Sequence, residues 1–215
     1  MLRLGARPEM CIFANPIKQD SELLYAQEKD IKKMTFDSEE ELYRIKENFP
    51  KADCVLRIAT SVTTAVYNLN EKFGVPMQEV EGLLRLGKKL GLRMKGVAFH
   101  CGSGGVTFQA YSDSIKNARK VFDMAQGLGL KEMDFLDIGG GFTLLQPIGN
   151  GKNIDEVGSK INSLINELFP DTKVQVIAEP GRYISEAVQY LCSRIIGSKT
   201  MKDGHKHYYL NNGIY

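Results

Sequence analysis

The chain has 215 residues, enough for one domain with a sizeable core or for one domain and part of another. Its 28 basic and 26 acidic residues are interspersed and leave a formal net charge of +2, so electrostatics give no reason to expect binding to nucleic acid or a membrane surface. Hydrophobic residues at 43% and charged residues at 25% are ordinary values for a globular protein.

The cysteines, at positions 11, 54, 101 and 192, form no CxxC pair, and with only three histidines there is no zinc-ligand cluster. This spacing favours reduced thiols over a disulfide framework. No apolar run approaches the ~18–20 residues that cross a bilayer, and the N-terminus has no signal-peptide pattern. We therefore expect a cytoplasmic protein without a metal site and without nucleic-acid or membrane partners.

Short apolar segments of strand type alternate with helical segments through six units. The strands are expected at Met10–Ala14, Met34–Phe36, Cys54–Ala59, Gly96–His100, the start of Asp134–Thr143, and Val174–Ala178. The helices are expected at Ser21–Asp30, Ser38 to about Phe49, Val75–Leu90, around Ile115–Ala125, and Ile154–Leu168. Ser38 is the expected N-cap of the second helix, and Glu41 follows three residues later, as in a capping box.

This alternation is typical of parallel strands covered by helices. Six units are too few to close an eight-stranded barrel, so both an incomplete barrel and an open doubly wound sheet fit the pattern. Both folds place ligand-binding groups at the carboxyl ends of the strands. Beyond Tyr183 two strands are expected without a helix between them, at Tyr190–Ile196 and His207–Leu210, which predicts the start of a β-rich domain.

Polar residues and glycines follow four consecutive strands. The four sets are Arg57; His100 with Gly102, Ser103 and Gly104; Gly139–Gly141; and Glu179 with Gly181 and Arg182. Arg182, Ser103 and the glycine amides can bind a phosphate. Glu179 can pair with a protonated ring nitrogen, and His100 can lie against a flat ring. A cofactor with a phosphate, a pyridine nitrogen and a π-face would use all of these groups.

Each set also has a simpler explanation. Three consecutive glycines suit a tight turn that binds nothing. Arg57 could form an ion pair with Asp37, and Glu179 could pair with Arg182. A lone strand-end histidine such as His100 is more often a satisfied polar residue than a catalytic one. Taken singly, each set is better explained without a ligand, but four sets at consecutive strand ends favour one cofactor site.

The motifs resemble, in order and approximate spacing, those of eukaryotic-type ornithine decarboxylase, a fold-type III pyridoxal-phosphate (PLP) enzyme. They are CIFANPIKQ, MTFDSEEEL, VLRIAT, VAFHCGSG, VFDMA, LDIGGGF, IAEPGRY and YYLNNGIY. Diaminopimelate decarboxylases share the GGG and EPGR elements, but FHCGSG and YYLNNGIY look more like the ornithine branch. The resemblance implies an α/β fold: an incomplete (β/α)₈ barrel of the alanine-racemase type over residues 1–182, then the first strands of a β-rich domain over residues 183–215.

The resemblance also implies roles for the strand-end residues. His100 would stack on the cofactor ring, and Glu179 would keep the pyridine nitrogen protonated, which strengthens the ring as an electron sink. Arg57 would lie near that ring, and Ser103, Gly141 and Arg182 match the phosphate-binding positions. The expected cofactor-binding set is Arg57, His100, Ser103, Gly139, Gly140, Gly141, Glu179, Gly181 and Arg182.

Three departures from the family pattern bear on activity. The family's Schiff-base lysine lies upstream of the segment that matches Met10–Ala14, and nothing in Met1–Pro8 resembles it. The family's C-terminal cysteine and aspartate, which reach into the partner subunit's active site, lie beyond Tyr215. Asn212 stands where the family usually has an aspartate that binds the substrate's distal ammonium. We therefore expect a fragment of an enzyme that converts ornithine to putrescine in polyamine biosynthesis, inactive as it stands.

Two other functions fit the sequence. One is a non-catalytic regulator similar to the antizyme inhibitors, since residues 21–44 correspond to the region through which animal relatives bind antizyme. The other is a related decarboxylase with another amino-acid substrate, which Asn212 leaves open. The retained Arg57, GGGF and EPGR residues favour enzyme ancestry. The intact relatives are expected to be homodimers, and unpaired strand edges make a well-behaved monomer of this chain unexpected.

Overall fold

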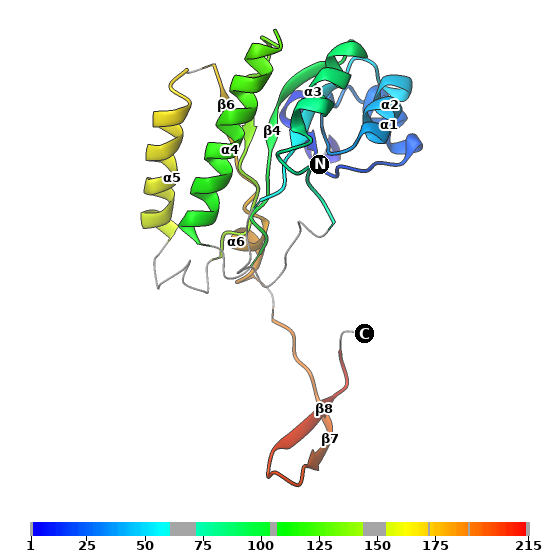
Figure 1. Cartoon of the computed structure of the whole chain (residues 1–215). Helices are drawn as coiled ribbons and strands as arrows, with labels where there is room; N and C mark the ends of the chain where they lie inside the picture. The colour runs from blue at the N-terminus through cyan, green and yellow to red at the C-terminus, as the bar shows by residue number, and fades with distance from the viewer. Residues whose placement is uncertain are drawn as a thin grey trace.

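A computed structural model describes residues 2–60, 72–103, 107–143, 154–171, 173–188 and 190–213. Six parallel strands alternate with helices in one sheet, and a two-stranded antiparallel sheet follows (Figure 1). The strands of the larger sheet are β1 Ile12–Phe13, β2 Lys33–Phe36, β3 Asp53–Arg57, β4 Arg93–Ala98, β5 Phe135–Asp137 and β6 Gln175–Ile177. The α-helices are α1 Asp20–Glu28, α2 Glu39–Asn48, α3 Val80–Lys89, α4 Phe108–Gly127, α5 Ile154–Leu168 and α6 Gly181–Ser185.

The order of the strands in space is the order of the strands in the sequence, from β1 to β6, and every pairing is parallel. A doubly wound sheet reverses its strand order at a switch point, whereas a barrel does not. The sheet is therefore an arc of a (β/α) barrel, which confirms the fold expected from the motifs and excludes the open doubly wound alternative.

Two apolar clusters lie on opposite faces of this sheet. The larger one joins the strands to the helices, and it includes the apolar stripe of α5 at Val157, Ile161 and Ile165. The smaller one consists of Val55, Ala98 and Phe135, with Ile12 and Ile177 packed against it. Since Ile12 and Ile177 belong to the two edge strands, their contact with one cluster means that the sheet curves around it.

The expected capping box at the start of α2 is only half correct. Ser38 is the N-cap, and its Oγ accepts the N–H of Glu41 at 3.3 Å. The Glu41 side chain does not return to the Ser38 amide, because it is buried and pairs with the buried Lys18, with an Nζ–Oε1 distance of 2.7 Å. A complete capping box occurs instead at the start of α1, between Gln19 and Glu22.

Two elements begin five residues later than expected. The helix expected from Val75 begins only at Val80, because Val75 forms a parallel bridge with Ile58 beside the sheet. The strand expected from Tyr190 begins at Ile195, because β8 extends no further than the residue opposite Ile195.

The antiparallel pair, β7 Ile195–Thr200 and β8 Lys206–Leu210, lies apart from the barrel arc (Figure 1). All of its residues are exposed. The proposed division of the chain at residue 182 stays a prediction. No helix in the described part of the chain is both long and apolar enough to cross a membrane.

Candidate functional site

A small cavity of about 10 Å³ lies at the carboxyl ends of the six parallel strands, and each strand or the residues that follow it contribute to its wall. A volume of this size admits about one water-sized sphere. The lining residues are Ala14, Thr35, Arg57, Ala98, Phe99, His100, Asp137 and Glu179. The structure therefore brings together three of the expected site residues, Arg57, His100 and Glu179. With Asp137 they form what we call the strand-end cluster.

The turn after β5 requires glycine. Gly139 and Gly141 have φ angles of 66° and 97°, which side-chain-bearing residues rarely adopt. A Cβ on Gly139 would lie 2.2 Å from the carbonyl oxygen of Phe99, and one on Gly140 would lie 2.4 Å from the carbonyl oxygen of Glu179. The turn thus packs directly on the backbones of the two neighbouring strand ends.

Three hydrogen bonds hold this turn in place. The Gly139 N–H donates to the Asp137 carboxyl group at 2.9 Å, and the Glu179 N–H donates to the Gly139 carbonyl at 2.7 Å. The hydroxyl of the fully buried Tyr111, on α4, donates to the Gly140 carbonyl at 2.8 Å. The turn is therefore held by hydrogen bonds to the end of β5, to the residues after β6 and to α4.

The amides of Gly140 and Gly141 remain available in this turn. Among the residues that the structure describes, neither N–H has a hydrogen-bond acceptor, although both residues are buried. Buried backbone donors are nearly always paired, and consecutive glycine amides are suited to an anion. This favours an anion cradle over a turn that binds nothing.

His100 is held as a neutral imidazole. Its Nδ1 accepts the Gly102 N–H at 3.0 Å, so the proton of the neutral ring lies on Nε2. Burial, aided by the nearby Arg57, lowers the pKa of His100 to about 4. A neutral ring packed beside Gly140 can lie against a flat cofactor without adding charge.

Asp137 and Glu179 form an acidic pair on the wall of the small cavity, with Asp137 buried and Glu179 half-buried. Burial raises the pKa of both, and that of Asp137 reaches about 7 because the neighbouring Glu179 carboxylate adds to the effect. Arg57 opposes both increases. Its own pKa is lowered by burial, and its guanidinium lies 4.9 Å from the centroid of the Phe73 ring.

The simpler ion-pair explanations are wrong. Asp37 accepts the Gly74 N–H at 2.7 Å, and within the described residues it forms no ion pair with Arg57. Arg182 pairs with Glu186, at 3.5 Å between Nη1 and Oε1, and leaves Glu179 to the acidic pair.

Other expected site residues lie around or away from the cluster. Gly181 begins α6 and donates its N–H to the Glu179 carbonyl at 2.8 Å. Ser103 is half-buried in the loop between β4 and α4, and Gly104 lies outside the described residues. Asn212 follows β8, is exposed, and is not brought to the cluster.

The sequence interpretation missed two residues of the site, Asp137 and Tyr111. Asp137 carried a signal, since it is an acid that ends a buried strand and is separated from the glycines only by Ile138. Tyr111 lies four residues before Ile115 on the apolar face of α4, a spacing that indicates burial but not a bond to a glycine turn.

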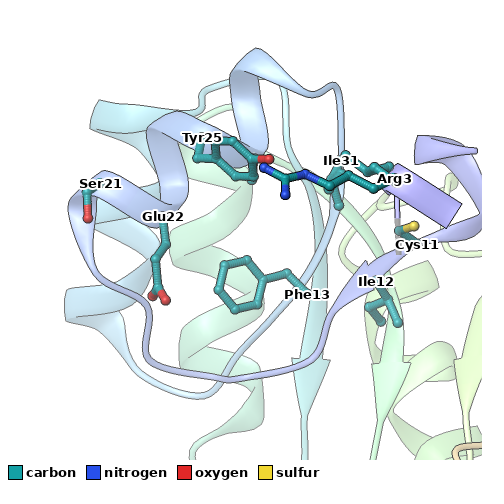
Figure 2. A pocket seen from close by; sticks show the side chains of 10 residues that line it. Arg3, Cys11, Ile12, Phe13, Ser21, Glu22, Tyr25 and Ile31 are labelled. Carbon is teal, nitrogen blue, oxygen red and sulfur yellow. The ribbon is translucent and has the colours of Figure 1, made fainter. Parts of the chain in front are cut away.

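A much larger hollow lies elsewhere, beside β1 and α1, with a volume of about 830 Å³ (Figure 2). Phe13, Tyr25 and Ile31 contribute to its largely apolar wall, and its charged residues are Arg3 and Glu22. It contains no residue of the strand-end cluster. The residues expected from the sequence to form the site therefore lie at the strand ends and not in this larger hollow.

Residues 1–186 match the family model "Pyridoxal-dependent decarboxylase, pyridoxal binding domain". The chain is similar to Decarboxylase flvG of Aspergillus flavus, with 39% identity over 98% of this chain and 49% of the relative. It is also similar to Antizyme inhibitor 2 of Xenopus laevis, with 38% identity over 99% of this chain and 48% of the relative. Ornithine decarboxylase of Saccharomyces cerevisiae is 36% identical over 100% of this chain and 45% of the relative.

The arginine decarboxylase of Paramecium bursaria Chlorella virus has a similar solved structure, with a TM-score of 0.85 and 33% identity over 98% of this chain and 55% of that one. The chain spans about half the length of the curated relatives it matches. These similarities, together with the barrel arc and its strand-end cluster, show that the chain belongs to the pyridoxal-dependent decarboxylase family and carries its pyridoxal-binding domain.

Proposed function

We propose that the chain supplies the cofactor-binding part of a PLP-dependent ornithine decarboxylase, which converts ornithine to putrescine. The observation that carries this proposal is the pair of buried amides at Gly140 and Gly141, which find no acceptor among the described residues and lie beside Arg57, His100 and Glu179. A phosphate accepts from such amides, and a pyridine ring needs the flat and acidic neighbours found next to them.

Two groups of residues would bind PLP, one its phosphate and the other its ring. The phosphate would be held by the glycine turn at Gly139–Gly141, with Arg182, Ser103 and Gly181 around it. The ring would be bound by Glu179, which accepts a hydrogen bond from the protonated nitrogen, by the neutral His100 against its face, and by Arg57 nearby. Bound PLP supplies an electron sink for the electron pair left when CO₂ departs.

Binding of PLP to this polypeptide tests the proposal directly. Calorimetric titration should give saturable binding, and pyridoxal without its phosphate should bind much more weakly. Replacing Arg182 by Met should weaken PLP binding about tenfold or more, since a charge-assisted hydrogen bond to phosphate is lost. Arg194→Met, in the exposed segment before β7, is the matched control. No binding of PLP at millimolar concentration, or equal binding by both variants, would contradict the proposal.

We expect no decarboxylation by the 215-residue polypeptide alone, since none of its residues matches the family's Schiff-base lysine. The CO₂ released from carboxyl-labelled ornithine in the presence of PLP measures decarboxylation. Turnover near that of an intact relative would refute the expectation that the polypeptide is inactive. In the intact protein, expected to be a homodimer, kcat/KM for ornithine, arginine and lysine would decide the substrate, which Asn212 leaves open.

A second candidate is a regulator that binds antizyme, supported by the 38% identity to Antizyme inhibitor 2. Residues 21–44 would provide the contact, and Leu24, Tyr25 and Tyr43 in this segment are about half exposed. A pull-down with antizyme distinguishes this candidate. Capture that is lost in the double variant Leu24→Ser, Tyr25→Ser would support it, and absence of capture would remove it.

A further inference from the structure

Asp137 connects two parts of the strand-end cluster that lie on different strands. It ends β5, is 1% exposed, and pairs in register with Ile177 of β6, two residues before Glu179. One carboxyl oxygen accepts the Gly139 N–H, and Asp137 and Glu179 line the same small cavity at the strand ends. A single buried side chain thus joins the glycine turn to the acid.

The charges around this pair favour one shared proton. Arg57 of β3 is the cation that acts on both carboxyl groups, His100 after β4 is neutral, and Asp37 after β2 adds a further negative charge near Arg57. Two ionised carboxylates would exceed the charge of one guanidinium in a buried site. One proton between Asp137 and Glu179 leaves a single negative charge beside Arg57.

The proton belongs on Asp137. Asp137 is more deeply buried than Glu179, and Arg57 is the strongest influence that keeps Glu179 ionised. The Asp137 oxygen that accepts the Gly139 N–H needs its lone pair, so the proton belongs on the other oxygen.

We propose that Asp137 is a positioning residue for Glu179: its protonated carboxyl group donates a hydrogen bond to the Glu179 carboxylate and holds it ready to accept from a protonated ring nitrogen. No covalent bond changes, and the proton stays on Asp137. This inference rests on the proposed function of the cluster as a PLP site.

Two substitutions at Asp137 separate its hydrogen bonds from its size. Asn keeps an oxygen for the Gly139 N–H and offers an N–H to Glu179, so Asp137→Asn should bind PLP within about threefold of the unchanged chain at pH 6.5, like a protonated Asp. Asp137→Leu has a similar size but neither group, and its PLP dissociation constant should rise about 10- to 100-fold. Asp134→Asn, just before the other end of β5, is the matched control.

A measurement without cofactor reports on the pair itself. The carboxyl ¹³C resonances of Asp137 and Glu179 should show a shared titration step near pH 7, and the Glu179 resonance should lose this step in Asp137→Asn. Absence of the step in the unchanged chain overturns the proposal. So does PLP binding by Asp137→Leu equal to that of the control, or a loss in Asp137→Asn as large as in Asp137→Leu.

These readouts keep the two proposals distinguishable. If the shared step is present but the unchanged chain binds no PLP, the proposed function fails and the role of Asp137 toward a ring nitrogen fails with it, while the proton-sharing pair stands. If PLP binds and Asp137→Leu has no effect, the proposed function stands and the positioning role fails.

Discussion

The two ends of the barrel arc differ in how their charged side chains are paired and how far they are buried. At the amino ends of the strands, Asp53 pairs with Arg93 at 2.8 Å and Lys95 pairs with Asp134 at 2.7 Å, and each pair has at least one partner in contact with solvent. At the carboxyl ends, the strand-end cluster gathers one guanidinium, one neutral imidazole and two acids in a buried space, where burial shifts the pKa of all four groups.

This difference indicates which end carries chemistry. Ion pairs between neighbouring strands balance charge locally, and when exposed to solvent they contribute little to the free energy of unfolding. Buried groups whose charges are incompletely balanced cost free energy, and such groups concentrate where a ligand binds or a reaction takes place. Substitutions at the two ends should therefore differ in size and in pH dependence.

The largest effect is expected at the glycine turn. Gly139→Ala places a methyl group 2.2 Å from the Phe99 carbonyl at a φ of 66°, and neither backbone can retreat without breaking the sheet. We expect a loss of about 3 kcal/mol or more in the free energy of unfolding, measured in urea. Gly158→Ala, on α5 with open space around it, should instead stabilise by about 0.5–1 kcal/mol. Equal effects would contradict the packing of the turn.

A comparable loss is expected at Phe135, the largest side chain of the cluster enclosed by the curved sheet. Phe135 is 1% exposed, so Phe135→Ala should cost about 3–4 kcal/mol in the free energy of unfolding. Val176→Ala, on β6 and 36% exposed, is the control and should cost less than about 1 kcal/mol. A small effect at Phe135 would mean that the edge strands do not close around it.

The next effect depends on pH. The pKa of Asp137 is raised from 3.8 to about 7 in the folded chain, so the folded state binds the extra proton between these values and stability falls as the pH rises through about 7. His100, with its pKa lowered to about 4, acts in the opposite sense between pH 4 and 6.5. The comparison of Asp137→Asn with the unchanged chain cancels the histidine contribution.

The free energy of unfolding of Asp137→Asn, relative to that of the unchanged chain, should therefore increase by about 2 kcal/mol as the pH rises from 5 to 8. Urea unfolding at several pH values measures this difference. A gain that does not change with pH would show that Asp137 is ionised throughout the range.

The smallest effect is expected at the amino ends. Lys95→Met breaks the pair with Asp134, whose side chain is 41% exposed, and should cost less than about 1 kcal/mol. The loss should diminish further in 0.5 M salt, because exposed charges are screened. A loss as large as that of Gly139→Ala would remove the contrast between the two ends.

The sequence by itself determined the alternation of elements and predicted the place of the candidate site. Short β-branched runs and 3.6-residue apolar stripes predict strands and helices locally, and parallel strands must bring Arg57, His100, Gly139–Gly141 and Glu179 to one edge. The motifs identified the family for the same reason, since they lie at those strand ends.

Only the tertiary structure decided which side chains interact across elements. Asp137 meets Glu179 and Tyr111 meets Gly140 across separations of 42 and 29 residues, since strand register and helix packing set these distances. Glu41 does not complete the capping box because it pairs with the buried Lys18. Val75 is not helical because it forms a parallel bridge with Ile58. Each of these outcomes depends on what is buried next to a residue, and local sequence patterns do not contain that information.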